Sequence, residues 1–378
     1  MLITDLVTDL ASKFASRAAE ADLIGKLPSE DVAALQDSGY LAISIPKEFG
    51  GWGLSLRQCV EAQIQLAQGS GSTAFVAGMT IQIFGYAREM ANWSPENYSR
   101  LASFVTQGGL VNSIASEPLM GSPSRGGLPH TNLTPSAVKD SWLLNGHKTW
   151  SSGGKHLTHM LVRASIGESE WAVALVHQNT PGIHWEETWS DSLSLRASDS
   201  HDVFFNDVPI PETDIIERGT TKRPPNPWFA MMLAAVYLGI AMAARNALIK
   251  YSLERIPTTL GKPIATLPNI QAEIGSIDMT LIAANNYLLD VADKWTGQPQ
   301  DITAYYPKIA AAKHLAVDTA VKVTEAALKT AGGASLTKAL PLERHFRDVR
   351  AGLMQPPAAD TAMQLLGNLA INNYTAKF

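Results

Sequence analysis

The spacing of apolar residues changes twice along this chain of 378 residues, and these two changes limit the folds it can adopt. Residues 1–110 have helical spacing, interrupted at "IPKEFGGWGLS" by proline and glycines. Residues 111–217 contain short alternating runs such as "WAVALVHQ", separated by "NG", "PG" and "ND" turn signals typical of antiparallel strands. Helical spacing returns over residues 226–378, after the linker "RGTTKRPPNP". The sequence therefore predicts an α+β protein with an N-terminal helical domain, a central antiparallel β domain and a C-terminal helical bundle.

The composition agrees with a large interior divided among several domains. Hydrophobic residues make up 46% of the chain and charged residues 17%, and the length exceeds that of one ordinary core. Because so few residues are charged, we expect other subunits to cover part of the surface. The net charge of −5 and the lack of a basic stripe argue against nucleic acid as a partner.

Cysteine content and apolar segments indicate the compartment. Cys59 is the only cysteine, so the chain can form neither an internal disulfide nor a cysteine-ligated metal cluster. Acidic residues interrupt the first apolar segment, which argues against a signal peptide. The longest uncharged run, Trp228 to Ala244, has 17 residues, and we interpret it as a buried core helix rather than a membrane span. We therefore expect a soluble, cytoplasmic protein.

The segment "GHKTWSSGG", residues 146–154, places Trp150 beside two serines and a glycine pair, between two strand-like runs. One interpretation is an ordinary hairpin with a surface tryptophan. The other is a site where a flat heterocycle stacks on the indole and accepts hydrogen bonds from the turn. No dinucleotide-binding or P-loop glycine motif is present, and His156 and His159 lack a third ligand, so we predict no metal site.

Four segments in order resemble the acyl-CoA dehydrogenase superfamily of FAD flavoproteins: "IPKEFGGWG" (45–53), "SIASEPLMGS" (113–122), "NGHKTWSSGG" (145–154) and "LSLRASDSHDVFFNDVPIPE" (193–212). The resemblance covers essentially the whole chain. It implies that the C-terminal helices form a four-helix bundle and that the protein is an FAD-dependent oxidoreductase. It also implies a homo-oligomer, dimer or tetramer, with a small-molecule substrate such as an acyl-CoA.

The resemblance assigns flavin-binding roles to individual positions. Ser116 would bond the pyrimidine end of the isoalloxazine, Trp150 would pack against the ring, and Ser152 would lie near its N5 edge. The remaining assigned residues surround the FAD pyrophosphate, either in the same chain or across a subunit boundary: Gly121, Ser122, Arg255, Gly332 and Gly333. A buried diphosphate needs a permanent cation, and arginine supplies one with fork geometry.

The catalytic base of the family cannot be carried over. Most members place a glutamate where this chain has Pro356, in "LMQPPAAD", and others place it near Phe229. Three nearby acids could serve instead, although the first two fit a salt-bridged helix face: Glu343, Asp348 and Asp360. We therefore assign no catalytic residue.

Three functions remain open at this stage. The first is a dehydrogenase that passes hydride from an acyl thioester to flavin N5 and electrons to an electron-transfer flavoprotein. The second is a two-component monooxygenase that receives reduced FMN or FAD as a co-substrate from a flavin reductase. The "ERHFRDVRAG…PP" segment resembles that of the dibenzothiophene monooxygenase-like flavin hydroxylases, which tend to carry histidine where this chain has Gln355. The third is a non-catalytic flavin-binding homologue.

Overall fold

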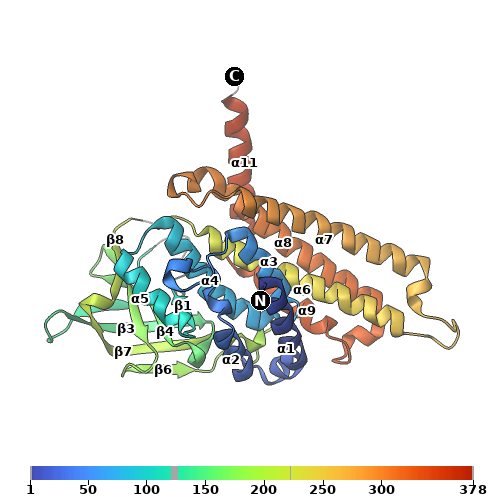
Figure 1. Cartoon of the computed structure of the whole chain (residues 1–378), viewed down its shortest axis with the longest axis horizontal. Coiled ribbons are helices and arrows are strands. Elements are labelled where there is room, and N and C mark those ends of the chain that lie inside the picture. Colours follow the sequence, from blue (N-terminus) through green and yellow to red (C-terminus); the bar gives the residue numbers. More distant parts are fainter. Residues whose placement is uncertain (1, 121–126, 222, 377–378) are drawn as a thin grey trace.

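The computed structural model describes residues 2–120, 127–221 and 223–376 and contains three groups of elements (Figure 1). The first group is helical and ends before residue 110. Serine side chains cap three of its helices: Ser55 in a capping box with Gln58, Ser70, and Ser94 directly before a proline. Its elements are α1 (Ile3–Ile24), α2 (Ser29–Asp37), η1 (Tyr40–Ala42), η2 (Lys47–Phe49), α3 (Leu56–Ala67), α4 (Gly71–Met90) and α5 (Pro95–Thr106).

The second group is one eight-stranded sheet with the order β6-β7-β3-β2-β4-β5-β8, to which β1 adds by pairing with β4. Most pairs are antiparallel, but β4 runs parallel to β1 and, at Ser165, to β2. A parallel partner is possible because β1 enters the sheet directly after α5, so no hairpin fixes its direction. The strands are β1 (Val111–Ile114), β2 (Asn132–Pro135), β3 (Ser141–Ser151), β4 (His159–Ile166), β5 (Glu170–His177), β6 (Ile183–Glu186), β7 (His201–Pro211) and β8 (Ile215–Gly219). Between the strands, the described residues form the 3₁₀ turns η4 (Gly154–His156), η5 (Arg196–Ser198) and η6 (Glu212–Asp214).

The third group is the C-terminal helical domain. Its α6, α7 and α8 pack on one another, while α11 packs its base on α8 and projects from the body (Figure 1). The helix α6 is long and apolar enough to span a membrane, but 89% of its most apolar window is buried inside the protein, as expected of a core helix. The elements are α6 (Pro227–Glu254), η7 (Ile264–Thr266), α7 (Pro268–Lys294), η8 (Pro299–Asp301), α8 (Ile302–Ala331), η9 (Gly332–Leu336), α9 (Leu342–Asp348), α10 (Ala351–Met354) and α11 (Ala359–Thr375).

Buried polar contacts fix the three domains against one another. Arg347 of α9 forms ion pairs with Asp22 of α1 at 2.6 Å and with Glu343 at 2.7 Å. The neighbouring Asp348 accepts the backbone N–H of Leu195, in the loop before η5, at 2.8 Å. Burial raises the pKa of Asp348 to about 6. The C-terminal segment is therefore tied to both other domains close to the end of β3.

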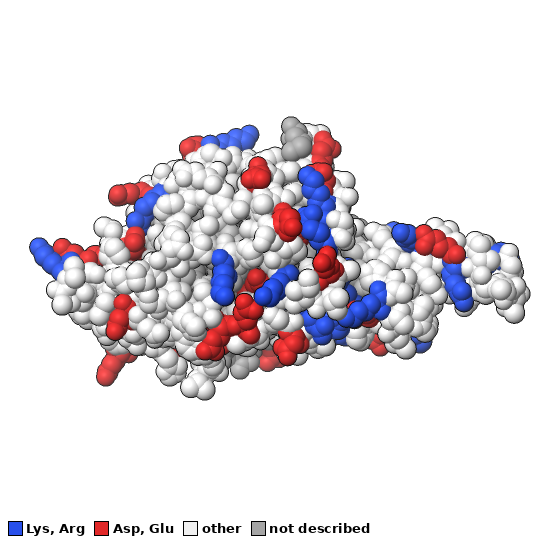
Figure 2. All heavy atoms as spheres, turned by 90° about the horizontal axis from the view of Figure 1, so that it is seen from below, with Lys and Arg blue, Asp and Glu red and all other residues white. Residues whose placement is uncertain are grey.

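The charged residues are dispersed on the face shown in Figure 2. Lys and Arg side chains alternate there with Asp and Glu side chains, and wide uncharged areas separate them. This face offers no continuous basic surface for a polyanion.

Candidate functional site

The end of β3 forms a tight turn that exposes an indole ring. Trp150 adopts a left-handed backbone conformation, with φ at 57°, and 59% of its surface is exposed. Gly153 and Gly154 follow with φ at 95° and 46°, and a Cβ on Gly153 would lie 2.8 Å from the Leu157 side chain. The glycine pair is therefore required by the backbone and by packing. The turn presents a large aromatic ring to solvent from a closely packed backbone, which is a conformation often found at binding sites.

The segment after β1 lies directly beside this turn. Thr149 donates its N–H to the Ser116 carbonyl at 3.0 Å, and the Asn112 side chain donates to the Ser152 carbonyl at 2.9 Å. The structure thus brings three of the residues assigned to the flavin site, Ser116, Trp150 and Ser152, into one region; their role in binding flavin stays a prediction. Two further predicted residues, Gly121 and Ser122, lie outside the described residues.

A buried ion pair, which the sequence analysis did not identify, anchors both ends of the segment between Ser116 and Thr131. Lys148 Nζ lies 2.7 Å from Glu117 Oε1, and their side chains are 0% and 2% exposed. Glu117 also accepts the N–H groups of His130 and Thr131 at 2.8 and 3.0 Å. Burial opposes ionisation of both groups, but contacts with Lys148 and Thr131 together outweigh burial for Glu117 and lower the pKa of that carboxyl. Burial lowers the pKa of Lys148 to about 8. Glu117 lies in the segment "SIASEPLMGS" and Lys148 in "NGHKTWSSGG", so the pair could have been sought among the charged residues of these two motifs.

The Ser152 side chain is buried within a cluster of hydroxyl groups. Its Oγ lies 2.7 Å from Ser200 Oγ, which lies 2.8 Å from Ser198 Oγ. Ser198 is the last residue of η5, and Ser200 lies in the loop between η5 and β7, so both partners come from a separate part of the sequence. Neither Ser198 nor Ser200 is among the site residues predicted from the sequence.

Three predicted cofactor residues lie far from this turn in the same chain. Arg255 follows α6, and Gly332 and Gly333 follow α8, at helix ends on the side of the molecule away from β3 (Figure 1). Arg255 is exposed, and within the described part of the chain its guanidinium has no ion-pair partner. Gly332 has φ at 68° and ψ at −149°, which only glycine adopts readily. Around Gly333 an added Cβ would meet nothing within 4 Å, so nothing within the described chain requires a glycine there. Within one chain, the residues predicted at the Trp150 turn and those predicted at the ends of α6 and α8 are therefore far apart.

The three acids considered as replacement bases have structural partners. Glu343 pairs with Arg347, and Asp348 accepts the Leu195 N–H. Asp360 is exposed and accepts the N–H of Thr361 at 2.7 Å in the first turn of α11. Each of these three carboxylates therefore already has a hydrogen-bond or ion-pair partner, and none is free to act as a base.

The segment at the expected base position is held rigidly. Lys313 of α8 is 3% exposed and donates to the carbonyls of Gly352 and Gln355 at 2.8 and 2.6 Å. Burial lowers the pKa of this amine to about 8. The hydroxyl of Tyr237, on α6, donates to Gln355 Oε1 at 2.6 Å. The position before Pro356 therefore carries an amide with a fixed orientation.

The turn has the chemistry needed to hold a flat heterocycle. It offers an exposed indole face for stacking and, beside it, the buried hydroxyl of Ser152. Among the described residues, the acceptors for this hydroxyl are Ser200 and, at 3.5 Å, the Trp150 carbonyl. Ser151 Oγ, at the end of β3, is buried and has no hydrogen-bond partner within the part of the chain that the structure describes. Such unused hydrogen-bonding capacity next to an open aromatic face fits a ligand that stacks and accepts hydrogen bonds at one edge.

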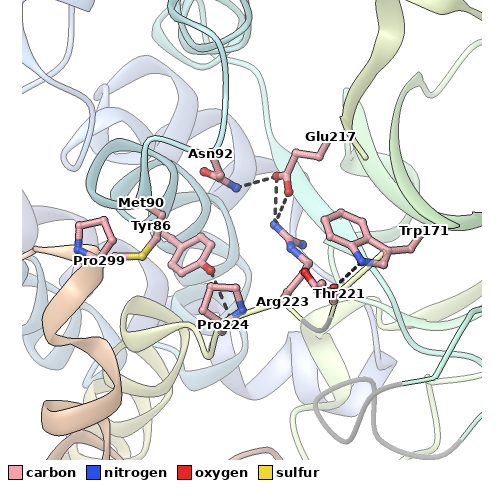
Figure 3. A pocket seen from close by; sticks show the side chains of 9 residues that line it. All are labelled: Tyr86, Met90, Asn92, Trp171, Glu217, Thr221, Arg223, Pro224 and Pro299. Carbon is pink, nitrogen blue, oxygen red and sulfur yellow. Dashed lines mark hydrogen bonds and ion pairs between the residues drawn. The ribbon is translucent and has the colours of Figure 1, made fainter. Parts of the chain in front are cut away.

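A cavity of about 200 Å³ lies elsewhere, between the end of α4, β5, β8 and the linker before α6 (Figure 3). Its Glu217 accepts from Asn92 at 2.8 Å and pairs with Arg223 at 2.8 Å, while the Tyr86 hydroxyl donates to the Pro224 carbonyl at 3.3 Å. These groups satisfy one another and tie the linker to the N-terminal helices. We therefore interpret this cavity as a structural junction.

Comparison with known proteins identifies the family. The N-terminal, middle and C-terminal domains of acyl-CoA dehydrogenases match residues 2–94, 114–208 and 231–354. The Bacillus subtilis protein YdbM, which carries the name of an acyl-CoA dehydrogenase, is 34% identical over 360 residues, covering 94% of this chain and 93% of its own. These matches define an FAD-dependent oxidoreductase. The chain belongs to the acyl-CoA dehydrogenase family.

Solved structures with the same fold include two kinds of flavoenzyme. The dibenzothiophene monooxygenase TdsC from Paenibacillus sp. A11-2, solved with FMN and indole, has a TM-score of 0.86 at 24% identity, covering 98% of this chain and 97% of its own. Butyryl-CoA dehydrogenase from Megasphaera elsdenii has a TM-score of 0.83 at 22% identity, covering 98% of both chains. The predicted α+β fold of three domains is thereby confirmed.

Proposed function

We propose that this protein is a two-component flavin monooxygenase, which receives reduced FMN or FAD from a separate reductase and oxygenates a small apolar or aromatic compound. The observation that carries the proposal is that the two positions where related dehydrogenases hold their base are occupied here by Pro356 and Phe229. A dehydrogenase must remove a proton from carbon with a base within hydrogen-bond reach. Transfer of oxygen to a substrate has no such requirement.

The groups that do stand near these positions favour binding over proton abstraction. Tyr237 holds Gln355 Oε1, which leaves the Nε2 donors of the amide without a partner among the described residues. An amide can donate and accept hydrogen bonds but cannot accept a proton near neutral pH. Gln355 is therefore suited to orienting a substrate.

The chain would hold the flavin through the turn at the end of β3. Reduced flavin, when bound, supplies two electrons, so that one atom of dioxygen can enter the substrate and the other can leave as water. Trp150 would stack on the ring, while Ser116 and Ser152 would hydrogen-bond its edges. Ring stacking and the apolar Leu119, which is 88% exposed, would exclude water once the ring is bound.

The second candidate is an acyl-CoA dehydrogenase, favoured by the 34% identity with YdbM. It would pass hydride from an acyl thioester to the flavin, and electrons onward to an electron-transfer flavoprotein. This function would need a base that is neither Pro356 nor Phe229. No observation favours the third alternative, a non-catalytic flavin binder.

One experiment separates the two candidates. The purified protein is supplied with FMN, NADH, a flavin reductase, isotope-labelled dioxygen and indole, the compound named in the TdsC complex. The monooxygenase proposal expects label in an indole product, at a rate well above that of a reaction without the protein. In parallel, the FAD-loaded protein is mixed anaerobically with butyryl-CoA. Bleaching of the flavin by butyryl-CoA, with no labelled product from indole or other aromatic probes, would support the dehydrogenase instead.

We also propose that the protein acts as a homo-oligomer, a dimer or tetramer, since homotetramers are typical of the family. The outer face of α7 supports this proposal. Met279 and Ile282 are 68% and 60% exposed there, next to the small residues Ala272, Gly275 and Ala283. Apolar and small residues along one uncharged helix face favour close packing with another helix. An oligomer would also let Arg255 reach a cofactor held by a neighbouring subunit.

A further inference from the structure

Three serine hydroxyls form a line that begins inside the β domain and ends at the Trp150 turn. Ser198, Ser200 and Ser152 are 0%, 3% and 4% exposed, and their Oγ atoms are separated by 2.8 and 2.7 Å. Ser198 and Ser200 flank Asp199, and the backbone N–H of Gly153 donates to the Ser198 carbonyl at 2.9 Å. The line is therefore fixed to the same turn that carries the exposed indole.

The direction of the hydrogen bonds along this line follows from its closed end. Within the described residues, Ser200 Oγ is the only acceptor for the hydroxyl hydrogen of Ser198. A buried hydroxyl without an acceptor is costly, so Ser198 donates to Ser200. Ser200 has then accepted one bond, and its own hydrogen is directed to Ser152.

The open end of the line is consequently a donor. Ser152 accepts from Ser200, so its hydrogen must point elsewhere, and within the described chain only the Trp150 carbonyl, at 3.5 Å, is available. That distance is long for a bond between a hydroxyl and an oxygen. The hydrogen is thus available to a ligand beside the indole, and a series of aligned hydroxyls strengthens the terminal donor.

We infer that Ser198 and Ser200 are positioning residues that hold Ser152 as a fixed hydrogen-bond donor toward the N5 edge of the bound flavin. The inference rests on the proposed flavin position beside Ser152. N5 of oxidised flavin has a lone pair in the ring plane and accepts well, whereas N5 of reduced flavin carries a hydrogen. A donor that cannot turn round therefore stabilises the oxidised ring more than the reduced ring. It lowers the reduction potential of the bound flavin and favours release of electrons to dioxygen.

The test is the two-electron midpoint potential of flavin bound to purified variants. Ser200→Ala removes the hydroxyl that accepts from Ser198 and frees the Ser152 hydroxyl to rotate. We expect the preference for oxidised over reduced flavin to fall about tenfold, the order of one hydrogen bond, which raises the potential by about 30 mV. Ser200→Thr keeps a hydroxyl and should restore the wild-type potential. Ser198→Ala leaves Ser200 free to reverse its direction and should also raise the potential, by a smaller amount.

A matched control removes an equally buried serine hydroxyl elsewhere. Ser44 is 0% exposed and donates to the Ile81 carbonyl at 2.8 Å in the N-terminal helical domain, and Ser44→Ala should leave the potential unchanged. A wild-type protein that binds no flavin overturns both the proposed function and this inference. If the wild type binds flavin but Ser198→Ala and Ser200→Ala have the same midpoint potential as the wild type, this inference is overturned and the proposed function is not. If Ser200→Ala does not fold, Ser198→Ala decides by the same measurement.

Discussion

Replacing Lys148 with methionine tests whether the buried ion pair with Glu117 organises the segment after β1, where we propose that flavin binds. The change removes the cation from a carboxylate that is 2% exposed, although Glu117 keeps the N–H groups of His130 and Thr131. Breaking one side of a buried pair costs about 3–5 kcal/mol, because a charge remains buried without its partner. Since two backbone donors remain, we expect Lys148→Met to lower the free energy of unfolding by about 3 kcal/mol, near the lower end of that range.

The double variant Glu117→Gln with Lys148→Met provides the control. It removes both charges. Glu117 accepts the two backbone N–H groups through separate oxygens, so the single glutamine carbonyl keeps one of these hydrogen bonds and loses the other. We expect it to cost only about 1 kcal/mol, because replacing a buried pair with neutral groups is often close to neutral. The two single changes should therefore be strongly non-additive, by about 2 kcal/mol or more.

The measurement is urea-induced unfolding of the flavin-free protein, followed by circular dichroism for the wild type, both single variants and the double variant. A parallel fluorescence titration measures flavin affinity. We expect the affinity to fall in both single variants, because Ser116 adjoins Glu117 and its carbonyl accepts from Thr149 in the turn of Trp150. Single costs that add to the double cost within about 0.5 kcal/mol would refute the reasoning, since additivity means that the two side chains do not interact.

Three further changes test other parts of the structure. Trp150→Ala should weaken flavin binding at least about tenfold in the same titration while leaving the urea midpoint nearly unchanged, since the residue is 59% exposed; unchanged affinity would exclude stacking on this ring. Ile282→Lys should reduce the assembly to smaller species in sedimentation velocity, because the side chain is 60% exposed on α7; an unchanged sedimentation coefficient would place the interface elsewhere. Burial raises the folded-state pKa of Asp348 from 3.8 to about 6, so this carboxyl contributes stability below pH 4 that is lost as the pH rises through about 6. A pKa difference of about 2, at about 1.4 kcal/mol for each pKa unit, corresponds to about 3 kcal/mol. The free energy of unfolding of Asp348→Asn, relative to that of the wild type, should therefore be higher at pH 7 than at pH 4 by this amount. Urea unfolding that gives the same difference between variant and wild type at both pH values would contradict this prediction.

The sequence predicts the elements better than the contacts between them. Changes in apolar spacing locate the three domains because that spacing reports which face of each element is buried. The parallel pairing of β1 with β4 is not readable in this way, because strand direction depends on where the preceding helix ends. Ser116, Trp150 and Ser152 are predictable as a group, since each stands in a short motif at the end of a strand. The serines at 198 and 200 are not, because their role arises only when a second segment folds against the turn.

The loop at residues 355 and 356, where related dehydrogenases hold their base, shows how one residue can change which reaction a fold supports. The C-terminal loop is fixed by Lys313 and by the contact of Asp348 with the β domain, so whatever side chain stands at residues 355 and 356 is held in a constant place. A glutamate held there could abstract a proton, but this chain holds an amide, oriented by Tyr237, and a proline. The turn at the end of β3, where we propose that flavin binds, is independent of that choice, because its own contacts come from the β domain. Under the proposed function, the same scaffold keeps its flavin turn, while the side chains at residues 355 and 356 determine whether a base is available to the substrate.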